Sequence, residues 1–187
     1  MPLAKEQPRY TYAAYLEWDE DERYELIDGE AYMLAAPSRI HQEISMALST
    51  VLYNFLEGKP CKVYAAPFAV QLFPAEDETD DTVVEPDISV VCDPSKLDDR
   101  GCKGAPDLVI EIASPSTARY DRIVKFNKYR EAGVREYWIA EPEERAVFAY
   151  TLKNGEYTAA VYEKTAPPAV LPGCEIDLEA IFRTAEA

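Results

Sequence analysis

The sequence predicts an α/β protein in which a mixed (α+β) sheet packs against helices, with a β-hairpin on each side of the core. Its core reads in order as helix, strand, strand, strand, helix, strand, and Asp28-Gly29 and Asn154-Gly155 each separate two strand-like runs. Such dipeptides are strong hairpin signals. With 187 residues, 48% of them hydrophobic, the chain can bury one core, so we expect a single domain over 1–187 with its core at about 11–182.

The first part of the chain predicts two helices separated by a hairpin. Thr11 and Ser38 are residue types that cap helix N-termini, and the apolar residues after Ser38 recur at helical spacing. The expected elements are a helix from Thr11 to Trp18, hairpin strands at 23–27 and 30–34, and a helix from Ser38 to Phe55.

The remainder alternates strands with one further long helix. Pro94, Gly101 and Gly104 favour a mobile loop over the site between two central strands, and Gly133 is placed to end the helix. The expected elements are strands at 62–65, 68–73, 85–91 and 106–112, loops at 76–81 and 93–105, a helix at about 116–132, strands at 136–140, 145–152 and 156–162, and a short helix ending near Phe182.

The charge balance limits how the chain can meet nucleic acid. There are 19 Lys and Arg residues against 35 Asp and Glu residues, a net charge of −16. A DNA backbone repels such a chain unless a local basic patch or a bound metal ion intervenes, which argues against a nonspecific DNA coat.

The sequence contains neither a membrane-span signal nor a secretory one. No window of about 18 uninterrupted apolar residues is present. The first residues also lack the apolar core of a signal peptide, so we expect a cytoplasmic protein.

The four cysteines are Cys61, Cys92, Cys102 and Cys174. They are widely spaced and form no C-x-x-C pair, so zinc binding is disfavoured. Free thiols in a reducing compartment are the expectation, ahead of a structural disulfide.

Two acids interrupt apolar runs on what should be neighbouring strands. Asp87 opens one run and Glu111 lies inside the next. An unpaired carboxylate in such a setting costs several kcal/mol, so each needs a cation or hydrogen-bonding partners. A divalent ion is one partner. The alternative is that the acids lie at strand ends, facing water or paired with Arg or Lys.

The helix that follows carries Asp121, Lys125 and Tyr129 at steps of four, hence on one face. We interpret Asp121 as a surface ion-pair partner of Lys125. Because its helix directly follows the Glu111 strand, Lys125 could alternatively reach back to the carboxylates, orient a water and neutralise charge on a phosphate oxygen.

Two further residues are candidates for the site. Glu25 is either a third metal ligand or an exposed or ion-paired strand residue, and His41 is either a site residue or a capping or packing residue. Asp107 we interpret as structural. One histidine cannot make a zinc site alone, and no G-x-S-x-G, Walker or G-x-G-x-x-G motif is present.

Several segments together resemble a known family. They are residues 24–30, 38–44, 85–88, 106–117 and 133–138, with Asp121 and Lys125 between the last two. In this order they resemble the Uma family of restriction-endonuclease-like proteins, a branch of the PD-(D/E)xK nuclease superfamily.

The resemblance implies an αβββαβ nuclease core and Mg²⁺- or Mn²⁺-dependent cleavage of DNA. It implies Asp87, Glu111 and the Ile112 carbonyl as metal ligands. The superfamily lysine two residues after the second acid is replaced here by Ala113. Either Lys125 has taken over its role or the site is impaired.

The leading hypothesis is therefore a Mg²⁺- or Mn²⁺-dependent endonuclease that hydrolyses DNA phosphodiester bonds. Its catalytic residues would be Asp87, Glu111, Lys125, Glu25 and His41. The alternative is a catalytically impaired protein of the same fold that acts as a dimeric binding or regulatory module, favoured by the net charge of −16 and by Ala113. Tyr-rich hairpin edges are the surfaces through which a homodimer could pair.

Overall fold

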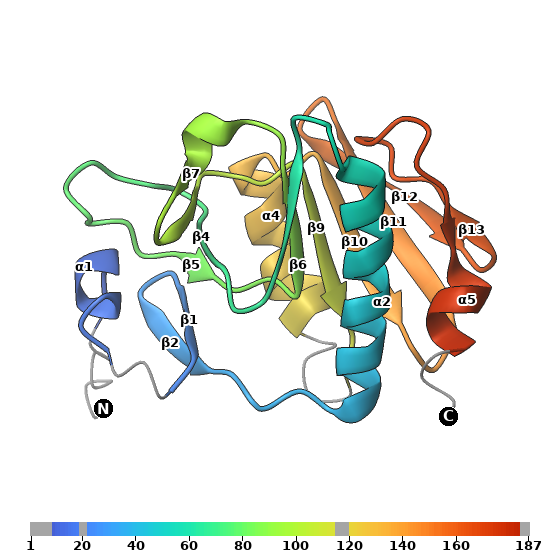
Figure 1. Cartoon of the computed structure of the whole chain (residues 1–187). Coiled ribbons are helices and arrows are strands. Elements are labelled where there is room, and N and C mark those ends of the chain that lie inside the picture. The colour runs from blue at the N-terminus through green and yellow to red at the C-terminus, as the bar shows by residue number, and fades with distance from the viewer. Residues whose placement is uncertain (1–8, 19–21, 115–119, 184–187) are drawn as a thin grey trace.

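A computed structural model of the chain describes residues 9–18, 22–114 and 120–183 (Figure 1). The described structure contains two six-stranded mixed sheets, and the site includes a side chain from each of them, Glu25 and Glu111. No helix within the described ranges is long and apolar enough to cross a membrane.

The central sheet has the strand order β12-β11-β10-β9-β6-β3. Strands β9 and β10 run parallel, and every other neighbouring pair is antiparallel. With α2 (Arg39–Leu56) and α4 (Phe126–Ala132), its strands give the predicted order helix, strand, strand, strand, helix, strand. The strands are β3 (Lys62–Ala65), β6 (Ile88–Val91), β9 (Leu108–Ile112), β10 (Glu136–Glu141), β11 (Ala146–Lys153) and β12 (Glu156–Tyr162).

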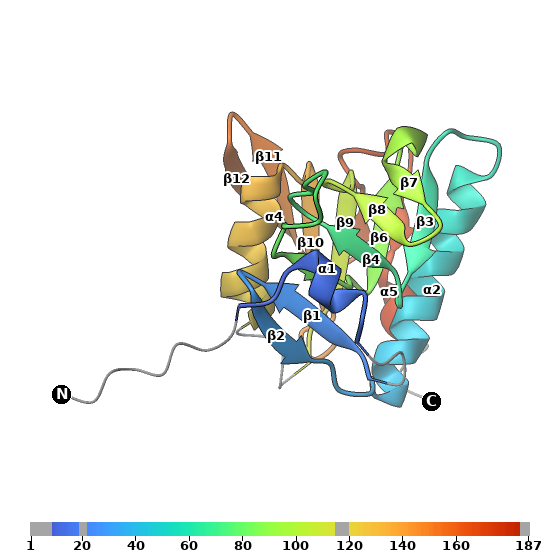
Figure 2. The same cartoon turned by 90° about the vertical axis from the view of Figure 1, so that its left-hand side faces the viewer.

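The second sheet was not expected from the sequence. Its strand order is β2-β1-β5-β4-β8-β7, and β4 pairs with β8 in parallel. The N-terminal hairpin, β1 with β2, forms one end of it (Figure 2). Its strands are β1 (Tyr24–Ile27), β2 (Glu30–Met33), β4 (Ala69–Gln71), β5 (Val83–Val84), β7 (Leu97–Asp98) and β8 (Gly101–Lys103).

The expectation of a mobile loop over residues 93–105 is wrong. This segment forms the 3₁₀ turn η1 (Pro94–Lys96) and the β7–β8 hairpin, which closes one edge of the second sheet. Gly101 has φ +145°, and a Cβ there would lie 2.1 Å from the Ala69 carbonyl oxygen. The glycine therefore permits close strand pairing rather than flexibility.

Helices cover both faces of the central sheet. Helix α2 (Arg39–Leu56) packs on one face together with α5 (Leu178–Arg183), and α4 (Phe126–Ala132) lies on the other (Figure 1). Ser38 caps α2 as predicted, because its hydroxyl accepts a hydrogen bond from the His41 amide. A short two-stranded sheet, β13 (Thr165–Ala166) with β14 (Ile176–Asp177), precedes α5.

The turn predictions are confirmed by backbone geometry. Asp28 and Gly29 both have positive φ between β1 and β2, as do Asn154 and Gly155 between β11 and β12. Two consecutive positive φ values are what a tight two-residue hairpin turn requires. Gly133, with φ +87°, ends α4 in the left-handed region.

The predicted first and third helices are partly different. The first is the single turn α1 (Tyr12–Tyr15), which ends before Trp18. The predicted start of the third, at about residue 116, lies outside the described residues; the part that the structure describes is a π-helical turn, η2 (Asp121–Lys125), that leads into α4.

The cysteine prediction is wrong for two of the four residues. Cys61 and Cys92 form a disulfide, whereas Cys102 and Cys174 are buried thiols. The reason is the pairing of Lys62 in β3 with Val91 in β6, because the next position outward puts the two cysteines opposite each other. The two cysteines are 31 residues apart in the sequence, so their spacing alone does not predict that they lie close together.

Candidate active site

The two predicted acids lie opposite each other on adjacent strands. Ile88 in β6 pairs with Ile110 in β9, so the next position along the antiparallel register places Asp87 opposite Glu111. The Asp87 amide donates a 3.3 Å hydrogen bond to Oε2 of Glu111. Because side chains alternate along a strand, Glu111 faces away from α2, where Ile110 and Ile112 pack.

The ammonium of Lys125 contacts one carboxylate from each of the two sheets. Its Nζ lies 2.7 Å from Oε1 of Glu25 in β1 and 2.9 Å from Oε1 of Glu111 in β9. All three side chains are buried. Glu25 is thus an ion-paired strand residue, held further by the Glu85 amide, which donates to its Oε1.

Burial and mutual attraction set the charges of this cluster. Burial raises the pKa of Glu111 to about 8, although Lys125 opposes the shift. Burial alone would lower the pKa of Lys125, but Glu111, Glu25 and Asp121 together raise it well above its usual value. Lys125 is therefore a permanent cation, and Glu111 can hold a proton near neutral pH.

Tyr129 belongs to the same cluster, although we did not assign it to the site from the sequence. Its hydroxyl donates a 2.6 Å hydrogen bond to Oε1 of Glu111, and its side chain is fully buried. We call Glu25, Glu111, Lys125 and Tyr129 the buried network. The sequence signal for including Tyr129 in the site is its spacing of four residues from Lys125, which places both side chains on one helix face. A tyrosine at that spacing is equally typical of a core position.

Asp87 has a more open setting than Glu111. Its Oδ2 accepts a 2.7 Å hydrogen bond from the Ile112 amide and lies 3.0 Å from Nε2 of His41. His41 sits in the first turn of α2, so the Ser38 cap also positions the imidazole beside the acid. Within the described residues, Oδ1 of Asp87 makes no hydrogen bond.

A second acid–base pair stands beside Asp87. Arg23 contacts Oε2 of Glu85 through Nε at 2.8 Å and Nη2 at 2.6 Å, and the Tyr15 hydroxyl donates to Oε1 at 3.3 Å. Sequence reasoning did not single out either residue, because Glu85 comes before the apolar run and Arg23 opens a hairpin.

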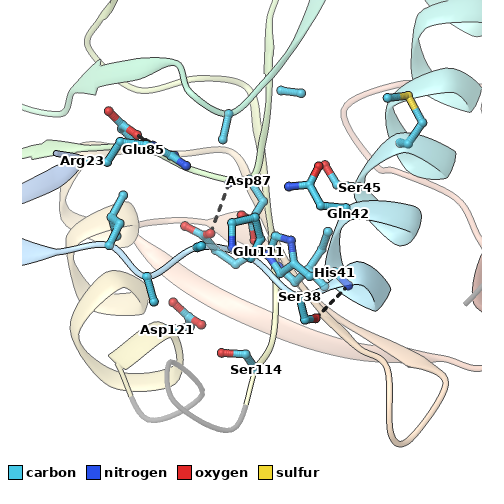
Figure 3. A pocket seen from close by; sticks show the side chains of 18 of the residues that line it. Arg23, Ser38, His41, Gln42, Ser45, Glu85, Asp87, Glu111, Ser114 and Asp121 are labelled. Atoms are coloured by element: carbon cyan, nitrogen blue, oxygen red, sulfur yellow. Dashed lines mark hydrogen bonds and ion pairs between the residues drawn. The ribbon is translucent and has the colours of Figure 1, made fainter. Parts of the chain in front are cut away.

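A cavity of about 470 Å³ lies at the end of β9 (Figure 3), and its lining includes Arg23, His41, Glu85, Asp87, Glu111 and Lys125. Glu85, Asp87, Glu111 and Asp121 lie on one side of it, and residues of α2 lie on the other. Asp121 is buried and lines the cavity, so its interpretation as a surface ion-pair residue is wrong.

Oxygen donors at this place fit a hard divalent cation. Across the described ranges, no three His, Cys, Asp or Glu side chains are grouped to hold a metal, so the protein would supply two carboxylates and a backbone carbonyl. Because N–H and C=O of one strand residue point to the same side, the Ile112 carbonyl shares the direction of its amide, toward Asp87. Mg²⁺ commonly takes one or two carboxylates and completes its shell with water and phosphate.

Two other predicted positions have structural roles. Asp107 accepts from the Cys92 amide at 2.8 Å and pairs with Arg135 at 2.9 Å, as expected for a structural residue. Ala113 is buried, and its amide donates to the Ala140 carbonyl at the end of the β9–β10 pair.

Comparison with known proteins gives a family and a fold. Residues 12–179 match the model of the family Uma2, described as "Putative restriction endonuclease". Two uncharacterized proteins of Synechocystis sp., slr1290 and sll1609, are 36% and 29% identical over 124 residues, which is 65% and 64% of this chain. The chain spans 63% of the length of the first and 67% of the second.

A solved structure shares the architecture. The crystal structure of a protein from Anabaena variabilis, titled "a putative nuclease belonging to DUF820", superposes with a TM-score of 0.76 at 20% identity. The match covers 94% of this chain and 99% of that one. At this identity the likeness establishes the shared mixed α+β fold alone.

Proposed function

Since the chain belongs to the Uma2 family of restriction-endonuclease-like proteins, we propose that it is a metal-dependent endonuclease that hydrolyses DNA phosphodiester bonds. The observation that carries the proposal is the placement of Asp87 opposite Glu111, with the Lys125 ammonium 2.9 Å from Glu111. Two carboxylates and a buried cation at one strand end are the groups that phosphodiester hydrolysis needs.

Asp87, Glu111 and the Ile112 carbonyl are the groups that would hold Mg²⁺ or Mn²⁺. The chemistry that such an ion supplies is a lowered pKa for a bound water and charge neutralisation at the phosphate. Tyr129 and Lys125 both hold Oε1 of Glu111, which leaves Oε2 on the Asp87 side. His41 and the Ile112 amide hold Oδ2 of Asp87, which leaves Oδ1 as the oxygen available to an ion.

Lys125 has the charge that the residue replaced by Ala113 would otherwise provide. Its ammonium is fixed by Glu25 and Glu111, so it would present a preorganised positive charge to a water or a phosphate oxygen. Glu25 would act through Lys125 as a positioning residue. This division of labour gives each of the five sequence-predicted catalytic residues a role.

The test is a cleavage assay on plasmid and oligonucleotide DNA with Mg²⁺ or Mn²⁺, with metal binding measured by calorimetry. Asp87→Asn should abolish both cleavage and saturable metal binding. The exposed Asp99→Asn, the same change on the β7–β8 turn, should leave both unaltered. Unchanged metal binding by Asp87→Asn would refute the ligand assignment.

A second candidate is a non-catalytic, dimeric binding or regulatory module with this fold. Two observations favour it. The net charge is −16, and the two lysine or arginine side chains that line the cavity within the described part of the chain, Arg23 and Lys125, are both paired with acids. If the wild-type protein cleaved no DNA substrate with either metal ion and formed a stable dimer in sedimentation, this candidate would be supported over the endonuclease.

A further inference from the structure

The cavity wall opposite the carboxylates is lined by uncharged side chains. Helix α2 contributes Gln42, Ser45, Met46 and Ser49, which we call the α2 wall. Figure 3 labels Gln42 and Ser45 on this helix. None of the four is charged. The α2 sequence carries no charged residue at all from Ile44 to Leu56, although 29% of the whole chain is charged.

The groups on the α2 wall suit a planar, polar-edged ligand. A glutamine amide offers both donors and an acceptor, the combination that reads nucleobase edges. Met46 is 68% exposed, and its thioether can pack against a ring. The Ser49 hydroxyl is enclosed without a hydrogen-bonding partner among the described residues, so a ligand could satisfy it.

We propose that the α2 wall binds one nucleobase of an unpaired DNA strand. The phosphate next to this nucleobase would be the one cleaved at Asp87 and Glu111. This inference rests on the proposed function and specifies its substrate class. A cavity of about 470 Å³ lies in the size range of small-molecule sites, and it holds the base-contacting wall and the acids together.

An unpaired strand fits this cavity better than an intact duplex. A paired base is stacked and enters a side cavity only when it is flipped out, which costs a few kcal/mol of lost pairing and stacking. Duplex binding usually recovers such costs through lysine and arginine contacts to both backbones. Among the described residues that line the cavity, both such side chains, Arg23 and Lys125, are already paired with acids, and the chain carries a net charge of −16.

The test measures binding by fluorescence anisotropy, with Ca²⁺ as the divalent ion. The probes are labelled homopolymers of each base, about eight nucleotides long, and a hairpin duplex. We expect the best homopolymer to bind about tenfold more tightly than the duplex. Gln42→Ala should narrow the spread of Kd across the four homopolymers.

A matched pair of α2 variants separates this site from a general charge effect. Met46 and Tyr53 are exposed to 68% and 65%, but only Met46 lines the cavity. Met46→Glu should weaken single-strand binding about tenfold, and Tyr53→Glu should change it less than about twofold. Thermal unfolding of both variants checks that each folds.

Three results would overturn the inference: equal or tighter duplex binding, equal effects of the two glutamate variants, or no saturable binding of any probe. The proposed function fails separately. Base-dependent binding without cleavage in Mg²⁺ or Mn²⁺ would refute the endonuclease alone, and cleavage by Met46→Glu at the wild-type kcat/KM would refute the α2 wall alone.

Discussion

The ammonium of Lys125 lies 2.7 Å from Oε1 of Glu25, and this contact joins the turn η2 to strand β1 of the second sheet. The same ammonium contacts Glu111 in the central sheet. One buried cation therefore holds together elements from three separate parts of the chain. Removing this cation would leave the buried Glu25 and Glu111 side chains without their shared partner.

Lys125→Met should destabilise the protein by about 3–5 kcal/mol at pH 7, because it leaves the buried Glu25 carboxylate without its cation and removes a hydrogen-bond donor from Glu111. Lys128→Met is the control, since Lys128 pairs with exposed carboxylates of Asp28 and Glu131 and should cost less than about 1 kcal/mol. Urea unfolding measures both. Equal effects would show that the Lys125 pairs contribute no more than a surface ion pair.

Tyr129→Phe should lower stability by about 2 kcal/mol, because it removes a buried hydroxyl from Oε1 of Glu111. It should also weaken Mg²⁺ binding several-fold, since Glu111 would no longer be held with Oε2 toward Asp87. Calorimetric titration and urea unfolding give the two quantities.

Tyr157→Phe is the matched control for that change. Its hydroxyl donates to the Val134 carbonyl, away from the acids, so its loss should cost about 1 kcal/mol and leave Mg²⁺ affinity unaltered. If the two variants bound Mg²⁺ alike, Tyr129 would be a packing residue only.

The parts of the fold that the sequence predicted well are those fixed by local chemistry. Asp28-Gly29, Asn154-Gly155 and Gly133 all adopt the positive φ values expected of them. The Ser38 cap and the apolar spacing after it gave α2 to within a residue. Each of these signals acts over a few neighbouring residues, so no tertiary information was needed.

The second sheet could not be predicted in the same way. Strands β5, β7 and β8 contain only two or three residues, too few for an alternating pattern to appear. Their pairing depends on contacts made across the fold, such as the approach of Gly101 to Ala69. The Cys61–Cys92 bridge was missed for the same reason, since it follows from the β3–β6 register.

The acids of the site could be predicted from the sequence because carboxylates interrupt apolar strands. Their neighbours could not, since a buried tyrosine such as Tyr129 is common in a protein core. Asp121 was assigned to the surface because a four-residue step to Lys125 fits an exposed helix equally well. Which face of the helix is buried is decided by the packing of η2 and α4 against both sheets.

Binding of Mg²⁺ should strengthen as pH rises toward about 8. Burial raises the pKa of Glu111 to about 8 in the metal-free protein, so below that pH the carboxyl keeps a proton that must leave before it can ligate. The affinity should therefore rise by up to about tenfold per pH unit between pH 6 and 8, and level off above. In Glu111→Gln the residual binding should not follow this pH profile; a profile that persists would assign the titration to another group.

The cysteines should give a thiol count that depends on folding and reduction. Burial raises the pKa of Cys102 to about 11 and also raises that of Cys174, so both thiols should resist alkylation in the native protein at pH 8. Unfolding without reductant should expose two thiols, and reduction should expose four. Cys61→Ser should cost about 2–4 kcal/mol, because the bridge closes a long loop in the unfolded chain. Four reactive thiols on unfolding without reductant would show that Cys61 and Cys92 are not joined, and Cys61→Ser would then leave the unfolding midpoint nearly unchanged.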